Sequence, residues 1–178
     1  DAELRLLSDS VLASQHITAK HSKELIDKIA SLSNKYFKSH IKNIYSVNDW
    51  NKSENVALFY NIDIIDEAIE TNRKIKFDYN KYGTNKKLHR SAFHIVSPYQ
   101  MILHNQRYFM MAHQEKWKHI TYYRLDRITN IELLDEPATD LRSIEGYQNG
   151  IDYRRFSSAL PYMFSDEPQT IRFIIDGE

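Results

Sequence analysis

The sequence predicts an α+β fold, in which N-terminal helices are followed by a small five-stranded antiparallel β-barrel. Two observations carry this prediction. Apolar residues recur at the spacing of a helix face within residues 1–32 and again over Asn61–Asn72. Between residues 74 and 134, short runs rich in aromatic and aliphatic residues alternate with brief polar segments, which is typical of strands joined by hairpin turns.

Several runs of this second region have strand character. They are Lys74–Tyr79, Leu88–Val96, Tyr99–Leu103, Arg107–His113, His119–Leu125 and Ile128–Leu133. A helix followed by five or so strongly bent strands is typical of a small SH3-like or Sm-like barrel. Successive strand residues point to opposite faces, and both faces of the central strands are largely apolar. We therefore expect the sheet to be covered on both sides.

The N-terminal segment carries two apolar stripes at helical spacing. They consist of Leu4, Leu7, Val11 and Leu12, and then of Leu25, Ile26, Ile29 and Leu32. Thr18 or Ser22 is suited to cap the second helix. Two short antiparallel helices fit this pattern. Two interpretations stay open: a linker that dimerises, or a helical flank that packs on the barrel.

The chain changes character after Leu134. Pro137 is expected to end the last strand, because proline cannot donate a ladder hydrogen bond. A short helix is expected near Asp152–Ala159, and Thr170–Ile175 resembles the first strand of a truncated C-terminal extension. The predicted divisions are residues 1–57 for the helical linker, 58–135 for the barrel, and 136–178 for the linker and start of the extension.

The composition bounds the function. With 24 basic and 24 acidic residues the net charge is zero, so any site for a polyanion must be local. The absence of cysteine excludes disulfides, thiolate zinc sites and thiol catalysis. No H-E-x-x-H, G-x-S-x-G or glycine-rich phosphate loop occurs, so we expect no metal, no cofactor and no enzymatic reaction. No run of about 18 apolar residues occurs, so we expect no membrane span and a cytoplasmic location.

Two arginines flank an acid at the end of the predicted strand His119–Leu125. An arginine in a sheet covered on both faces needs a partner, because an unpaired buried charge is costly. Asp126 is a candidate partner. We assign Arg127 to Asp126, because Arg127 lies just beyond the strand. Arg124, which shares a strand face with Tyr122, is then left for a ligand.

A specific order of residues runs through the predicted strands. It is Pro98-Tyr99, then Arg107-Tyr108-Phe109, then Tyr123-Arg124-Leu125-Asp126-Arg127-Ile128. Together with a helix and first strand over Ile65–Tyr79, this order resembles the WYL-domain family of bacterial transcriptional regulators, over about Asn61–Leu134. In the name-giving triplet, Arg107 and Phe109 stand where the family has tryptophan and leucine. We expect Arg107 to leave a wet edge, and Arg107→Trp to be tolerated or to stabilise the domain by on the order of 1 kcal/mol.

The resemblance implies the sensor part of a regulator, whose winged helix-turn-helix head would lie outside this sequence and bind operator DNA. It implies a homodimer and an anionic effector, such as a short single-stranded nucleic acid or a nucleotide. The residues expected to contact the effector are Tyr79, Arg90, His94, Tyr108, Arg124 and Arg127. His94 has a core histidine as its alternative role, and Tyr108 is either a core residue or a ring on which a base stacks. An Sm-like nucleic-acid-binding module without effector switching and a regulatory domain of an enzyme are the alternative functions.

Overall fold

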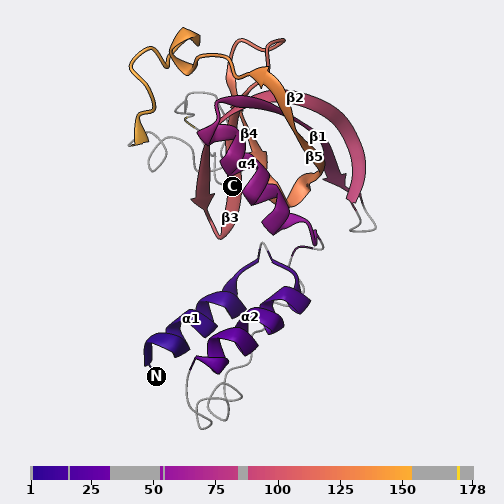
Figure 1. The fold of residues 1–178 in the computed structure, drawn as a ribbon, viewed down its shortest axis with the longest axis vertical. Coiled ribbons are helices and arrows are strands. Elements are labelled where there is room, and N and C mark those ends of the chain that lie inside the picture. Colours follow the sequence, from indigo (N-terminus) through magenta and orange to yellow (C-terminus); the bar gives the residue numbers. More distant parts are fainter. Residues whose placement is uncertain are drawn as a thin grey trace, which may run out of the picture.

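The computed structural model describes residues 2–15, 17–32, 53, 55–83, 88–153 and 172. Within these ranges three α-helices and five strands form an α+β fold, as predicted (Figure 1). The helices are α1 (Ala2–Ala13), α2 (Ala19–Ser31) and α4 (Leu58–Glu70). The strands are β1 (Arg73–Tyr82), β2 (Leu88–His104), β3 (Arg107–His113), β4 (Ile120–Arg124) and β5 (Ile128–Pro137). Two short 3-10 helices follow β4 and β5, namely η2 (Leu125–Arg127) and η3 (Leu141–Ser143).

The five strands form one curled antiparallel sheet in the order β4-β3-β2-β1-β5. The sheet is not closed, because β4 and β5 do not pair within the described part of the chain. This corrects the expectation of a closed barrel. The physical reason lies at the junction of β4 and β5, where η2 replaces a strand pairing. The backbone carbonyls of Leu125 and Asp126 in η2, and of Ile128 at the start of β5, accept hydrogen bonds from the side-chain amides of Asn55 and Asn61 and not from a neighbouring strand.

Strand β2 is longer than expected, since the predicted strands Leu88–Val96 and Tyr99–Leu103 are one continuous strand of 17 residues. Pro98 lies inside it and is tolerated because the pairing with β3 shifts register between Pro98 and Gln100. The β2–β3 turn is the two-residue hairpin Asn105-Gln106, with φ angles of 46° and 59°. Strand β3 has the predicted bounds.

The inner face of the curled sheet holds the main core. Helix α4 packs against this face through Leu58, Ile65 and Ala68, which contact a cluster that includes Phe77 and Met110. On the opposite face, residues of the segment 141–151 pack against β3 and β4. There Ile144 packs against Met111 and Ile120. The prediction that the sheet is covered on both sides is therefore confirmed for these strands.

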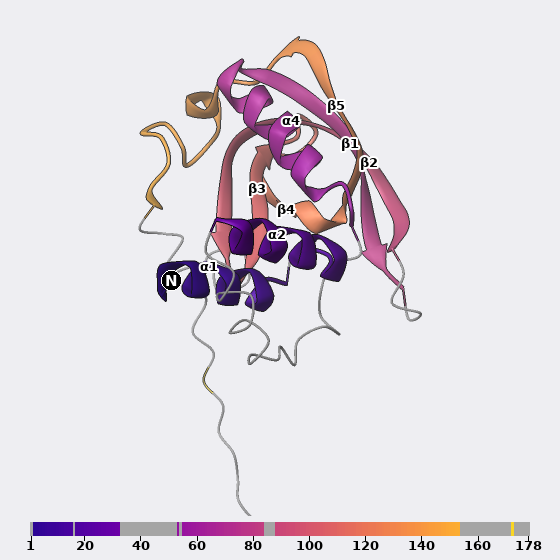
Figure 2. The same ribbon diagram turned by 60° about the horizontal axis from the view of Figure 1, so that its bottom comes forward.

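The predicted antiparallel helices α1 and α2 lie side by side beneath the curled sheet (Figure 2). Thr18 caps α2, because its hydroxyl accepts a hydrogen bond from the backbone N–H of His21 at 3.1 Å. Ile17, between the helices, is only 4% exposed and belongs to the main core. The helices thus contact the domain directly, as the helical-flank interpretation expects. In the described residues, no helix is both long and apolar enough to cross a bilayer.

The helix predicted near Asp152–Ala159 and the strand predicted at Thr170–Ile175 lie outside the described residues, apart from Asp152, Tyr153 and Arg172. Both stay predictions.

Candidate functional site

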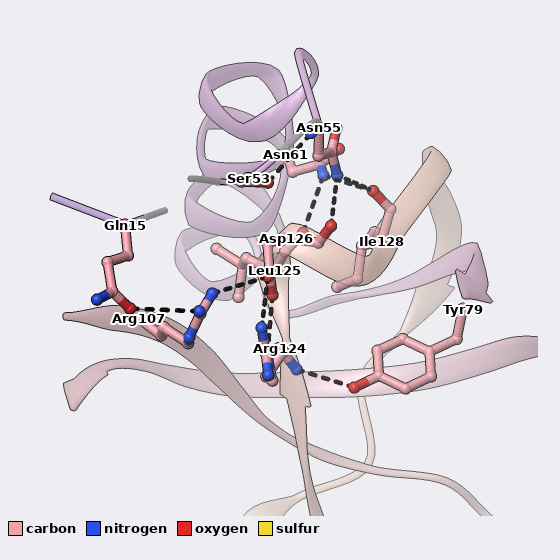
Figure 3. A network of polar contacts seen from close by, with 10 residues as sticks. All are labelled: Gln15, Ser53, Asn55, Asn61, Tyr79, Arg107, Arg124, Leu125, Asp126 and Ile128. Atoms are coloured by element: carbon pink, nitrogen blue, oxygen red, sulfur yellow. Dashed lines mark hydrogen bonds and ion pairs between the residues drawn. The ribbon is translucent and has the colours of Figure 1, made fainter. Parts of the chain in front are cut away.

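Asp126 lies in η2 and is 2% exposed, and two guanidinium groups contact its carboxylate (Figure 3). Arg124 forks onto it, with Nε 3.0 Å from Oδ1 and Nη2 2.6 Å from Oδ2. Arg107 reaches the same carboxylate from β3, with Nη1 3.2 Å from Oδ2. We call these three residues the Asp126 cluster. A buried acid in this setting stays compatible with folding because both partners donate charged hydrogen bonds to it.

In the Asp126 cluster, two guanidinium groups face one carboxylate. The arginine side chains also remain 23% and 22% exposed, for Arg107 and Arg124, whereas Asp126 is almost completely covered. A guanidinium has five N–H donors in a planar fork, so an arginine can hold a carboxylate and contact a second anion. Part of each guanidinium therefore reaches solvent, with the Asp126 carboxylate behind it.

Two buried asparagines hold the backbone beneath the cluster. Asn55 Nδ2 donates to the carbonyls of Asp126 at 3.1 Å and Ile128 at 2.8 Å. Asn61, on α4, donates from Nδ2 to the Ile128 carbonyl at 2.9 Å. These bonds fix η2 against the start of α4, so the Asp126 carboxylate is positioned by rigid neighbours.

Tyr79 joins the cluster to an aromatic group on the inner face. Its hydroxyl accepts a hydrogen bond from the backbone N–H of Arg124 at 3.2 Å. Its ring lies 5.3 Å from that of Tyr123 and 6.0 Å from that of His94. His94 in turn stacks on Phe77 at 5.6 Å. Burial raises the pKa of Tyr123 to about 12, so its hydroxyl keeps its proton beside the His94 ring, 3.4 Å from Nδ1.

His94 is held as a neutral ring in this aromatic group. Burial lowers its pKa from the ordinary value, the Gln114 side chain at 3.2 Å opposes that change, and the charge of Lys116 adds to it. Because the folded-state pKa is depressed, the neutral ring contributes stability above the unfolded-state pKa, and this contribution is lost as pH falls through the folded-state pKa.

We therefore expect the His94 ring to titrate below the ordinary value of 6.5 in two-dimensional NMR spectra. We also expect the loss of stability on acidification to be smaller in His94→Gln than in the unmodified protein. A His94 pKa above 6.5 would contradict the account.

The structure brings together some of the predicted effector contacts and separates others. Tyr79, His94 and Arg124 are linked through the contacts above. Tyr108 lies on the inner face and packs on the main core, whereas the ladder places Phe109 opposite Arg124. Tyr108 therefore lies on the opposite strand face from Phe109. Arg90 lies on β2, is 64% exposed and pairs with Asp78 at 2.8 Å, outside the cluster.

The pairing of Asp126 corrects two expectations. We assigned Arg127 as its partner and Arg124 to a ligand, whereas the carboxylate is held by Arg124 and Arg107. The reason is register. The β3–β4 ladder that sets Phe109 opposite Arg124 also brings Arg107 opposite Asp126 as β4 ends. Arg107 therefore has specific partners in Asp126 and Gln15, and we now expect Arg107→Trp to destabilise the domain.

Gln15, Asn55 and Asn61 were missed by sequence reasoning, because they reach the site from distant parts of the chain and carry no local pattern. The register of the β3–β4 hairpin was the signal that could have identified Arg107.

Part of the chain matches a known domain family. Residues 60–133 match the model of the WYL domain. Among solved structures, the chain is similar to proteasome accessory factor B/C (PafBC) of Arthrobacter aurescens, with 16% identity and a TM-score of 0.43. That similarity covers 57% of this chain and 14% of the other, so this chain matches only a small part of that protein's length. No curated protein matches the sequence. The family match confirms the resemblance carried by Tyr108 and the run from Tyr123 to Ile128: residues 60–133 of this chain form a WYL domain.

Proposed function

We propose that this chain is the effector-sensing part of a transcriptional regulator, and that its effector is an anion such as a short single-stranded nucleic acid or a nucleotide. The observation that carries the proposal is the Asp126 cluster, in which two partly exposed arginines face one buried carboxylate. In the whole protein, a winged helix-turn-helix head would bind operator DNA. Effector binding would shift an equilibrium between arrangements of that head.

The chemistry of the cluster fits phosphate. A guanidinium matches phosphate oxygens with parallel N–H donors, and charged hydrogen bonds are stronger than neutral ones. Two guanidinium groups beside one carboxylate would favour an anion at this place, although the formal net charge of the whole chain is zero. Tyr79 supports this role by holding the backbone of Arg124. The proposed role is binding alone and includes no catalytic step.

The proposal is tested by titrating the protein with an oligothymidylate of about ten nucleotides at several salt concentrations. We expect binding that weakens with salt, because phosphate contacts release counterions. Arg124→Lys keeps the positive charge but loses the fork. Its affinity is expected to fall about tenfold while the salt dependence stays nearly the same.

The matched control is Arg142→Ala, which removes an exposed arginine outside the Asp126 cluster and is expected to bind like the unmodified protein. Far-ultraviolet circular dichroism confirms that each variant is folded. If the unmodified protein does not bind at low salt, or if Arg124→Lys binds with unchanged affinity, the proposed site is wrong.

We further propose that the chain is a homodimer, with α1 and α2 at the interface. Leu6 is 69% exposed and Leu32 is 76% exposed, and neither position suits an isolated helix pair in water. A second copy of the chain would cover both. We expect sedimentation to show a dimer at micromolar concentration.

The charge variant Leu6→Glu is expected to give a monomer, because it places a carboxylate in the proposed interface. Gln148→Glu adds the same charge at an exposed position of the C-terminal segment and is expected to leave the dimer intact. A monomeric unmodified protein would refute the proposed dimer, and a dimeric Leu6→Glu would move the interface elsewhere.

A further inference from the structure

One arginine of the Asp126 cluster also contacts the segment formed by α1, α2 and the turn between them, which we call the helical hairpin. Arg107 donates from Nη1 to Asp126 and from Nη2 to the side-chain oxygen of Gln15, at 3.2 and 3.3 Å (Figure 3). Gln15 lies between α1 and α2, and its backbone carbonyl accepts a hydrogen bond from the N–H of Ser53 at 3.0 Å. A single guanidinium therefore connects the buried acid of the WYL domain with the turn of the hairpin.

The apolar part of this junction is incompletely packed. Ile17 is inserted into the main core, but an apolar groove of about 520 Å³ remains between the hairpin and the domain. Its walls include Val11 and Leu25 from the hairpin and Phe59 and Leu103 from the domain. Phe59 and Leu103 stay 42% and 59% exposed. Ile17, Val11 and Leu25 connect the hairpin to the main core, and the Arg107–Gln15 bond adds a polar contact beside the groove.

Of these two hydrogen bonds of Arg107, the one to Gln15 is the weaker, because its acceptor is a neutral amide oxygen and not a carboxylate. Phosphate is a charged acceptor and forms stronger hydrogen bonds with a guanidinium than an amide does. A phosphate that reaches the exposed side of Arg107 would therefore displace Gln15 before it displaces Asp126.

We propose that Arg107 couples effector binding to the helical hairpin: an anion bound at the Asp126 cluster takes the Arg107 donor from Gln15 and releases the hairpin from the WYL domain. The coupling rests on the proposed function, because it uses the same anion site. In this proposal Arg107, which stands where the family has tryptophan, transmits the signal. Gln15 holds the hairpin to the domain until an anion binds.

Thermodynamic linkage gives the signs of the effects. If anion binding must break the Gln15 contact, then removing the contact lowers the cost of binding. Gln15→Ala is therefore expected to bind oligothymidylate about threefold more tightly than the unmodified chain. Gln15→Glu places a carboxylate against Arg107 and so strengthens the contact between these two positions. This variant is expected to bind oligothymidylate about threefold more weakly or worse. A glutamine with a purely structural role would not produce tighter binding when it is removed.

The test combines this titration with a distance measurement in the full chain. The sequence has no cysteine, so nitroxide labels can be placed at Lys23→Cys on α2 and Glu67→Cys on α4, both exposed. Labelled protein is diluted with unlabelled protein, so that pulsed electron resonance reads distances within one chain. We expect oligothymidylate to change or broaden the distance distribution, and ligand-free Gln15→Ala to show that same distribution already. Gln148→Ala is the control that should change neither quantity.

The outcomes separate the two proposals. If the unmodified protein binds no oligothymidylate, the proposed function fails and the coupling fails with it. If it binds, but Gln15→Ala has the same affinity and label distances as the unmodified protein, the coupling alone is overturned. Tighter binding by Gln15→Ala together with a released hairpin supports both.

Discussion

Replacing Arg124 with alanine is expected to lower the free energy of unfolding by ~3 kcal/mol, because the variant leaves a buried carboxylate short of its main partner. Asp126 is 2% exposed and cannot turn to water, and Arg107 alone would hold it through a single bond of 3.2 Å. Urea denaturation at neutral pH measures the change. The structure thus corrects the simpler expectation that Arg124 serves only a ligand.

The matched variants are Asp126→Asn alone and in combination with Arg124→Ala. Asp126→Asn leaves two arginines that are 23% and 22% exposed and can still reach water, so it should cost less than Arg124→Ala. The double variant has no buried carboxylate that lacks its main partner, and it should be more stable than Arg124→Ala by about 1 kcal/mol or more. Additive losses in the double variant would show that the pair is not a buried ion pair in solution.

Restoring the family tryptophan is expected to destabilise the domain. Arg107→Trp removes a charged hydrogen bond to Asp126 and another bond to Gln15, and charged hydrogen bonds contribute about 1.5–3 kcal/mol each. Even with some gain from burying the indole ring, we expect a net loss of ~2 kcal/mol in urea denaturation.

Phe109→Leu is the control for Arg107→Trp, because it restores the other residue of the family triplet without touching a charge. It exchanges one apolar side chain for another and should cost about 1 kcal/mol or less. If Arg107→Trp is as stable as the unmodified protein, the Asp126 cluster does not depend on Arg107.

Much of the fold was predictable because the local patterns agree with the tertiary structure. The apolar stripes give α1, α2 and α4, and the bounds of β3 follow from the polar turns on either side of Arg107–His113. Two features were not predictable from local pattern. Pro98 suggested a break between strands, but a register shift accommodates it within β2. The open edge between β4 and β5 depends on Asn55 and Asn61, which reach η2 from distant positions.

Several residues of the candidate site were predictable from the sequence, but the arginine that pairs with Asp126 was not. Arg124 and Asp126 were identified from residue type and strand position, and Tyr79 from the family resemblance, and the structure does link them. Which arginine holds the acid depends on the β3–β4 register, and strand composition alone does not specify a register. The Gln15 contact spans 92 residues of sequence and has no local signal at all.

The central claim is that an anion binds at the Asp126 cluster, and arginine side-chain NMR tests it most directly. The Nε–Hε signals of nitrogen-15-labelled protein, assigned with single Arg→Lys variants, are followed during titration with oligothymidylate. We expect the signals of Arg124 and Arg107 to move together and saturate, while that of Arg142 stays in place. Signals of Arg124 and Arg107 that do not move while the oligonucleotide binds would place the site elsewhere and contradict the account.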